Sequence, residues 1–277
     1  MVENQIPTFI LKRILLIERS ETEDSVEEYL GSMLLSFCEK HCSVLKLTQT
    51  PKCSEAFKHC HLLDLLYHLI VSEHEKPEKQ TFESEEAPVV VTIPSLCELF
   101  SVGIRFKPSE GGIKDIHFDK MKGMFYLHVI KLDVNSEVIM RNIVAYEALT
   151  QPDSLVFTRY TELMRAIIDT VEDVKLLKKA QIIEKTSSLS VEETTDLFNG
   201  MSKSIGPTKT KKLDETIQKV NKYFHDKRKG NLYWIFTNYV YSSWKFFTLL
   251  STFVLLAMTA LEALCSVYDC RSHFRLK

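Results

Sequence analysis

Along most of the chain, apolar residues recur every three or four positions, the spacing of one face of an α-helix. The pattern predicts three helices before residue 72 and five more after residue 136, one of them opened by a capping box at Ser190–Glu193. The expected helices are Asn4–Ile17, Ser25–Cys38, Ser54–Val71, Val138–Leu149, Leu155–Val171, Val174–Ile183, Val191–Ser204 and Leu213–Lys229.

The pattern changes between these two groups of helices. Ser95 and Glu98 have the spacing of a capping box, which predicts a short helix ending near Val102. Apolar and polar positions then alternate, which is typical of strands with one buried face. The expected strands are Val89–Ile93, Ile104–Phe106, Ile113–Phe118 and Met124–Leu132, with a hairpin turn at Lys120–Gly123. The predicted fold class is therefore α+β, predominantly α-helical, with a small antiparallel sheet and a C-terminal transmembrane helix.

The transmembrane prediction rests on the last apolar segment. Phe246–Leu261 carries no charge, and a helix over Phe246–Tyr268 would be about 34 Å long, against about 30 Å for a hydrocarbon core. Glu262 opposes this assignment, because a charge near the bilayer centre costs about 3 kcal/mol, but it lies towards one end. Aromatic residues typical of a membrane interface precede the segment: Tyr233, Trp234, Tyr239, Tyr241 and Trp244. The alternative is a buried core helix, and we favour the membrane.

Charge is distributed unevenly over the 277 residues, whose net charge is −2. Residues 1–88 carry 16 acids and 9 bases, whereas residues 201–277 carry 5 acids and 13 bases. The basic segment Lys203–Lys229 holds nine Lys and Arg, which would suit anionic lipid headgroups; a solvated helix face is the alternative. Nucleic acid is not an expected partner, because no stacking motif or DNA-binding module accompanies these cations.

An acidic stretch divides the chain. Residues 72–88 contain six Glu and two Pro, which predicts a flexible loop. The expected organisation is a helical segment (1–71), this loop (72–88), a β-containing segment (89–135), a second helical segment (136–242) and the transmembrane helix (246–268). Because Met1–Leu11 lacks the features of a signal peptide, we expect a single-pass membrane protein with its N-terminal body in the cytosol.

Candidate chemistry is sparse. The residues of metal-ligand type that cluster are Cys38, His41, Cys42, Cys53, His59, Cys60 and His61. Their spacing matches no standard zinc pattern, so we interpret the cysteines as buried or incidental thiols, with a zinc-dependent interaction module as a minor alternative. Asp169, Glu172 and Asp173 are better explained by helix capping than by acid–base catalysis. The sequence predicts no catalytic residue, metal ligand or cofactor site.

Several segments resemble, in order, the motifs of one plant family, known as domain of unknown function 247. Met1–Leu11 is similar to "LLENQIPFFVL", Arg141–Glu147 to "RNLIAFE", and Asp196–Asn199 to "x-L-F-N". Further similar segments are His61–Val71, Ile93–Lys107, Tyr160–Ile183 and Ser243–Tyr268.

The resemblance implies an uncharacterised, membrane-associated plant protein, and recognition rather than catalysis. Typical members have a long N-terminal half before the segment that begins here at Met1, so the chain is expected to be a shortened form. Gln181 stands where the family usually has Gly, and Ser243 where it has Pro. We therefore expect a non-enzymatic protein that meets an unknown protein partner at a membrane; the alternative is a hydrolase or transferase with a site assembled from distant residues.

Overall fold

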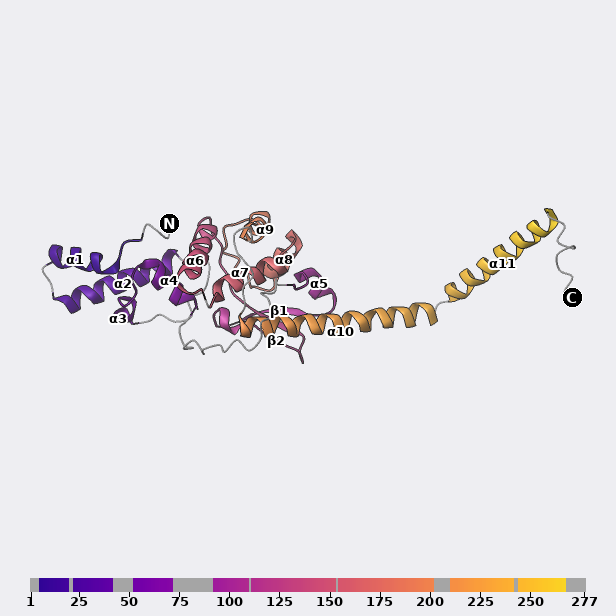
Figure 1. The fold of residues 1–277 in the computed structure, drawn as a ribbon, viewed down its shortest axis with the longest axis horizontal. Helices are drawn as coiled ribbons and strands as arrows, with labels where there is room; N and C mark the ends of the chain where they lie inside the picture. Colours follow the sequence, from indigo (N-terminus) through magenta and orange to yellow (C-terminus); the bar gives the residue numbers. More distant parts are fainter. Residues whose placement is uncertain are drawn as a thin grey trace. The chain divides into compact units, whose positions relative to one another are not determined.

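The structure is a computed structural model that describes residues 5–19, 22–41, 52–71, 92–109, 111–152, 154–201, 210–241 and 244–267. It forms two compact units, Met1–Phe224 and His225–Lys277. The elements of the first unit are α1 (Thr8–Arg19), α2 (Glu23–His41), α3 (Cys53–Ala56), α4 (Leu62–Val71), α5 (Leu96–Ser101), β1 (Arg105–Ser109), η2 (Ile113–Asp115), β2 (His117–Asp119), β3 (Met124–His128), α6 (Ser136–Thr150), α7 (Val156–Ile167), α8 (Val171–Lys179) and α9 (Val191–Gly200). Helix α10 (Lys211–Tyr241) begins in this unit, and α11 (Trp244–Val267) lies in the second (Figure 1).

The fold class is confirmed, with a correction to the sheet. Its three strands lie in the order β1-β3-β2. β2 and β3 form the expected antiparallel hairpin, but β1 runs parallel to β3, pairing Arg105 with Met124 and Ser109 with His128. The sheet is therefore mixed rather than antiparallel. The physical reason is that β1 adds to the far edge of β3 instead of pairing with β2, the next strand along the chain.

A larger and a smaller apolar core lie inside the first unit, and α4 contributes to both. Leu63, Tyr67 and Ile70 belong to the larger core, with residues of the sheet and of helices α5 to α10. Leu65 and Leu69 belong to the smaller core, with residues of α2 and α3. These two sets occupy opposite faces of the helix. α4 thus separates the two cores, and Figure 1 shows it between α2 and α6.

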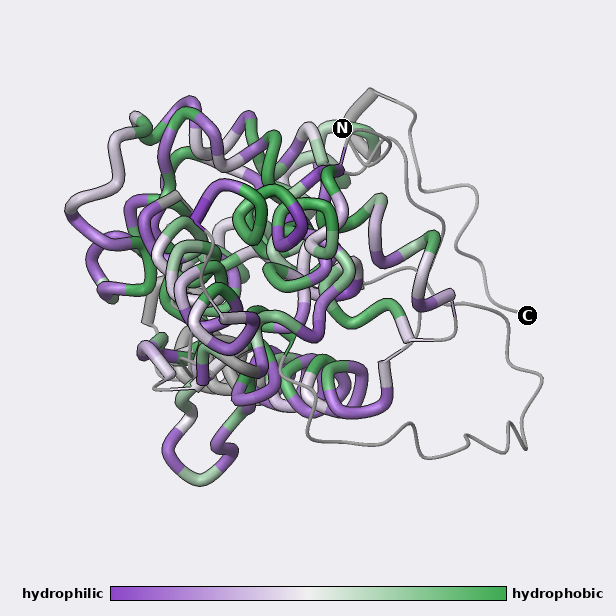
Figure 2. The backbone as a smooth tube through the Cα atoms, turned by 90° about the vertical axis from the view of Figure 1, so that its left-hand side faces the viewer, coloured by the Kyte–Doolittle hydropathy of each residue, from purple (hydrophilic) through white to green (hydrophobic). Residues whose placement is uncertain are grey.

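Most helices are amphipathic, as their spacing predicts. In Figure 2, hydrophobic and hydrophilic stretches alternate within many of the helical turns, as expected of helices with one apolar face. Both predicted capping boxes are present: the side chains of Ser95 and Glu98, and of Ser190 and Glu193, bond reciprocally to each other's backbone amides. These local signals therefore place the starts of α5 and α9 correctly.

Other boundaries differ from the prediction. The single helix expected over Ser54–Val71 is two helices, α3 and α4, because the chain turns at His59–His61. In that turn the Cys60 amide donates to Asp64 Oδ2 at 2.8 Å, and the Asp64 amide donates to His61 Nδ1 at 3.1 Å. These bonds cap α4 where no Ser or Thr marks its start.

Two expected strands are also corrected. Thr92 and Ile93 are not in a strand, and Val89–Val91 lie outside the described residues. Ile113–Asp115 forms a 3₁₀ turn, so β2 begins only at His117. The acidic stretch 72–88 lies outside the described residues as well.

Candidate functional site

A cluster of polar side chains surrounds Asp64 where α4 meets α6. The Tyr146 hydroxyl donates to Asp64 Oδ1 at 2.7 Å, and His68 Nε2 lies 3.1 Å from the same oxygen. On the other oxygen, Oδ2, Asp64 accepts the Cys60 amide and has His59 Nδ1 3.7 Å away. We refer to His59, Asp64, His68 and Tyr146 as the Asp64 cluster.

The charge of Asp64 is fixed by these neighbours. Burial alone would raise the pKa of the Asp64 carboxyl, but donors from His59, His68, Tyr146 and the Cys60 amide outweigh burial and hold that pKa well below its usual range. Burial, together with the adjacent carboxylate, raises the pKa of Tyr146 above its ordinary value. Asp64 is therefore an anion and Tyr146 a neutral donor throughout the physiological range.

A second buried carboxylate, Glu147, follows Tyr146 on α6 and has a different environment. Its Oε1 accepts the Tyr67 hydroxyl at 3.0 Å and the Phe157 amide at 2.8 Å. Its Oε2 accepts both the amide and the hydroxyl of Thr158, each at 2.7 Å. Glu147 thus caps the start of α7, where Leu155 at the N-cap position supplies no side-chain acceptor.

The protonation of Glu147 reflects its burial, since the residue has no exposed surface. Desolvation raises the pKa of the Glu147 carboxyl, and the donors from Phe157, Thr158 and Tyr67 offset this rise only in part. Because each carboxylate oxygen already accepts two hydrogen bonds, the geometry suits a structural acceptor better than a group that moves protons.

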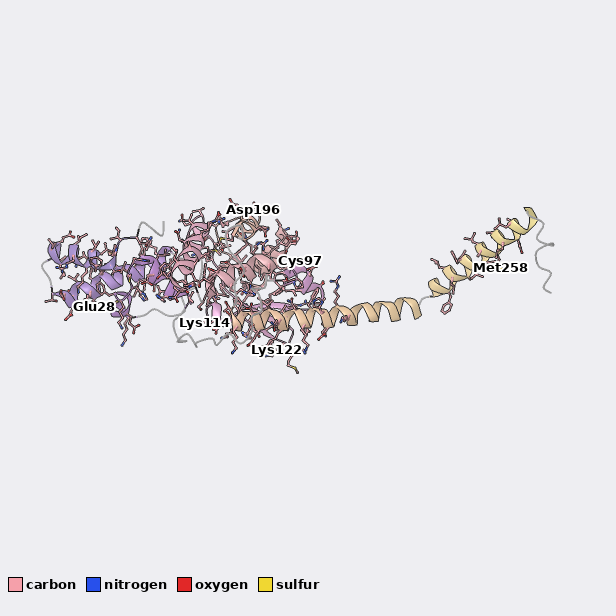
Figure 3. The ribbon with its side chains drawn as sticks, viewed as in Figure 1. Glu28, Cys97, Lys114, Lys122, Asp196 and Met258 are labelled. Atoms are coloured by element: carbon pink, nitrogen blue, oxygen red, sulfur yellow. The ribbon has the colours of Figure 1, made fainter. Side chains whose placement is uncertain are left out.

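Asp173 plays a similar part at α8 and α5. Its Oδ2 accepts the Thr170 amide and hydroxyl at 2.8 and 2.9 Å, and its Oδ1 accepts the Cys97 amide at 2.7 Å. Burial and the adjacent Asp173 carboxylate raise the pKa of the Cys97 thiol to about 11. Cys97, labelled in Figure 3, is therefore a protonated thiol. The bonds from Thr170 confirm the prediction that Asp173 acts in helix capping.

Helix α11 is the second candidate site. Over Phe247–Leu264 its mean hydropathy is 1.9, and by length and composition it is able to cross a membrane. Its apolar side chains are exposed on every side, among them Phe253 at 69% and Leu256 at 66%. Figure 3 shows one of its side chains, Met258, projecting from the helix. The predicted span of Phe246–Tyr268 agrees with α11 up to Val267; Tyr268 lies outside the described residues.

The predicted basic segment is partly described. Lys203 and Lys209 lie outside the described residues. The other cations of Lys203–Lys229 lie on α10 and have exposed side chains: Lys211, Lys212, Lys219, Lys222, Lys227, Arg228 and Lys229.

The described cysteines among the residues of metal-ligand type lie in different environments, and the sequence analysis interpreted them as buried or incidental thiols. Cys38 is buried in the smaller core, Cys53 is half-buried against it and Cys60 is exposed. The side chains of His41 and Cys42 lie outside the described residues. His59 instead approaches Asp64 and His68, which sequence reasoning did not select. The available signal was a polar pair four residues apart, Asp64 and His68, inside an otherwise apolar ten-residue helix.

The fold and these sites define a helix-rich α+β protein with a small mixed sheet, followed by an apolar helix able to span a membrane. The model of the DUF247 family, described as plant protein of unknown function, matches residues 1–258. The chain therefore belongs to the DUF247 family. It is also 31% identical to UPF0481 protein At3g02645 of Arabidopsis thaliana, in an alignment that covers 99% of this chain and 68% of that protein. No solved structure matches the chain.

Proposed function

We propose that the protein is a single-pass, membrane-anchored interaction protein without enzymatic activity, whose N-terminal unit meets a protein partner at the membrane surface. The observation that carries the proposal is α11, a helix whose mean hydropathy over Phe247–Leu264 is 1.9 and whose large apolar side chains there are exposed. Eighteen helical residues extend about 27 Å, close to the thickness of a hydrocarbon core.

The polar residues of α11 also suit a lipid environment. The hydroxyl groups of Ser251 and Thr252 donate to the Thr248 carbonyl, and that of Thr259 donates to the Leu256 carbonyl at 2.9 Å. Each donor is satisfied within the helix, as a membrane without water requires. Glu262 lies near the C-terminal end of the span, where a charge costs less than at its centre.

The cations of α10 support a headgroup contact. A basic segment beside a membrane span gains about 1 kcal/mol per cation near an anionic leaflet. Because the cytosolic leaflet is the anionic one, a headgroup contact of this kind favours a cytosolic N-terminal unit. A protease-protection assay on the full chain with an epitope tag at each end tests the orientation. The N-terminal tag should be digested in intact vesicles, and its protection would reverse the assignment.

The anchor is tested in the full chain by placing charge at the centre of the span. Leu255→Asp with Leu256→Asp should cost about 6 kcal/mol of insertion energy, at about 3 kcal/mol per Asp. This double variant should move from the carbonate-resistant membrane pellet to the soluble or aggregated fraction. The matched control adds the same charge at exposed apolar positions of the first unit, Met121→Asp with Val134→Asp, and should stay in the membrane.

The anchor proposal fails if the wild-type chain is extracted by carbonate, or if the α11 variant and the control fractionate alike. Either result would mean that α11 is covered by protein rather than by lipid.

An apolar stripe on α1 supports the interaction role. Ile10, Ile14 and Ile17 follow one another at spacings of four and three residues and are 39%, 53% and 82% exposed. Leu11 and Leu15, on a different face of the helix, pack against the smaller core. The stripe is therefore not needed for that core, and exposed apolar stripes of this kind mark interaction surfaces.

Proximity labelling with the full chain in plant tissue tests this role. Ile10→Ser, Ile14→Ser and Ile17→Ser together should remove specific protein neighbours while the chain stays in the membrane. The control changes scattered exposed apolar residues, Met121→Ser and Leu149→Ser, and should leave the neighbours unchanged. An unchanged set of neighbours in the α1 variant would refute the proposed surface.

A further inference from the structure

Three side chains of the Asp64 cluster present ligand atoms of the kind that transition metals prefer. One atom each from His59, Asp64 and His68 lies within 4.8 Å of the other two, and the two imidazole rings are 4.7 Å apart between centroids. The carboxylate oxygens lie 3.1 Å from His68 Nε2 and 3.7 Å from His59 Nδ1. Ligand atoms around tetrahedral zinc are separated by about 3.3 Å, given metal–ligand distances of about 2.0 Å. Small side-chain rotations would bring the three atoms to that spacing.

The backbone holds these ligands in place. Asp64 and His68 are four residues apart on α4 and therefore share a helix face. His59 lies in the turn before α4, and its carbonyl accepts the Thr8 hydroxyl at 2.8 Å. The adjacent Cys60 carbonyl accepts the Thr8 amide, also at 2.8 Å. The turn is thus fixed both to α4 and to Thr8, the first residue of α1.

Outer hydrogen bonds orient the carboxylate. Tyr146 donates to Asp64 Oδ1 and the Cys60 amide donates to Oδ2. Each carboxylate oxygen has two lone pairs, so one on each oxygen stays available for a metal ion. Tyrosine and amide donors of this kind are the usual second layer around metal-binding carboxylates, where they fix geometry and strengthen binding.

Exposure and ligand type narrow the choice of ion. The side chains of His59, Asp64 and His68 are 20%, 11% and 17% exposed, so an ion has access and a water molecule has room to complete the coordination. Two imidazoles and one carboxylate suit zinc and its neighbours in the first transition row. Magnesium and calcium prefer oxygen ligands and are disfavoured here.

We propose that His59, Asp64 and His68 bind one divalent zinc-like ion, which links the turn between α3 and α4 to helix α4. The bound ion would replace the direct contacts of Asp64 with the two histidines. The proposal does not depend on the membrane anchor, because every group involved lies in the first unit.

The test uses the full chain, purified in detergent, freed of metal with a chelator and titrated with Zn²⁺, with Mg²⁺ as the control ion. We expect one equivalent of Zn²⁺ to bind, Mg²⁺ not to bind, and Zn²⁺ to raise the midpoint of thermal unfolding. His59→Ala with His68→Ala should abolish both effects. The matched control His117→Ala removes an exposed histidine on β2 and should retain both.

A second variant keeps the test decisive if the double variant does not fold. Tyr146→Phe leaves all three ligands in place and removes one outer hydrogen bond, so Zn²⁺ affinity should fall about tenfold while one equivalent still binds. Co²⁺ in place of Zn²⁺ should give the visible absorption of a nitrogen- and oxygen-ligated ion, without a thiolate charge-transfer band.

Three results would overturn the proposal. The first is zinc well below one equivalent in the wild-type protein, which would leave Asp64 in a simple ion pair with His68. The second is full zinc binding by the double histidine variant. The third is a thiolate band with Co²⁺, which would assign the site to cysteine ligands such as Cys60.

Discussion

Replacing Glu147 by alanine should destabilise the first unit more than almost any other single change. The carboxylate accepts four hydrogen bonds from Tyr67, Phe157 and Thr158, and none of its surface is exposed. Alanine removes the common acceptor and leaves two backbone amides at the start of α7 without their partner. The helix dipole there also loses the negative charge that stabilises it.

The size of the effect follows from the loss of one partner in a buried charged network. Such a loss costs about 3–5 kcal/mol, because the remaining donors stay desolvated. We therefore expect the free energy of unfolding to fall by about 4 kcal/mol for Glu147→Ala. In a unit of this size, the melting temperature should fall by roughly 10 °C. Glu147→Gln keeps one acceptor oxygen but turns an amide group towards a backbone donor. Its free energy of unfolding should fall by about half as much as that of Glu147→Ala.

Pulse proteolysis of the full chain in urea and detergent measures the free energy of unfolding. Fluorescence is unsuitable, since both tryptophans, Trp234 and Trp244, lie in the second unit. The matched control is Glu137→Ala, which removes an exposed glutamate from the same helix together with its ion pair to Arg141. An exposed pair of this kind contributes less than 1 kcal/mol.

The test compares the free energies of unfolding of Glu147→Ala, Glu147→Gln and Glu137→Ala. The reasoning is wrong if Glu147→Ala loses no more stability than Glu137→Ala. It is also wrong if Glu147→Gln matches the wild type, because the desolvated charge would then contribute nothing to the cap on α7.

Three further predictions concern single positions. Gln181 adopts a left-handed backbone with φ of 60°, so Gln181→Gly should stabilise the protein by about 1 kcal/mol in urea unfolding, and Gln181→Ala should not. The Cys97 thiol has a pKa of about 11 against 9.0 for an ordinary thiol, so it should react with iodoacetamide at pH 8 about tenfold more slowly than an ordinary thiol, as measured by mass spectrometry. Because this pKa is raised, its contribution to stability is complete below about pH 9 and is lost as the pH rises through about 11. A Cβ at Gly31 would lie 2.3 Å from the Cys53 carbonyl oxygen, so Gly31→Ala should lower the free energy of unfolding by about 2 kcal/mol. A Cβ at Gly200 would meet only an Arg141 nitrogen at 3.6 Å, so the control Gly200→Ala should be neutral or slightly stabilising. Equal midpoints of urea unfolding for the two variants would contradict this prediction.

The features that the sequence predicts well are local. The capping boxes at Ser95 and Ser190 and the β2–β3 hairpin each involve residues a few positions apart, so their geometry is specified by neighbouring side chains. The left-handed backbone at Gln181 was not predicted, although it fits the glycine that the family usually has at this position.

Most of the features that the sequence did not predict depend on distant pairs. The parallel pairing of β1 with β3 has no local signal. The Asp64 cluster joins residues 82 positions apart, and Glu147 meets Tyr67 across 80. The break before α4 is capped by His61, a residue type that is not a usual cap, so the apolar pattern continued through it.

The carboxylates inside the first unit differ in the groups that surround them. Those that accept backbone amides have a structural role, whereas one that faces side-chain ligand groups is able to bind a ligand. Glu147 and Asp173 face backbone amides at helix starts, and the half-buried Asp214 accepts the amide of Thr210 at the start of α10. Acceptors in such positions offset the unpaired donors of a helix, which is a structural role. Asp64 also accepts one amide, but its oxygens face two imidazoles, which exchange a proton for a metal ion readily. Of these acids, Asp64 on α4 is therefore the one whose environment suits ligand binding as well as structure.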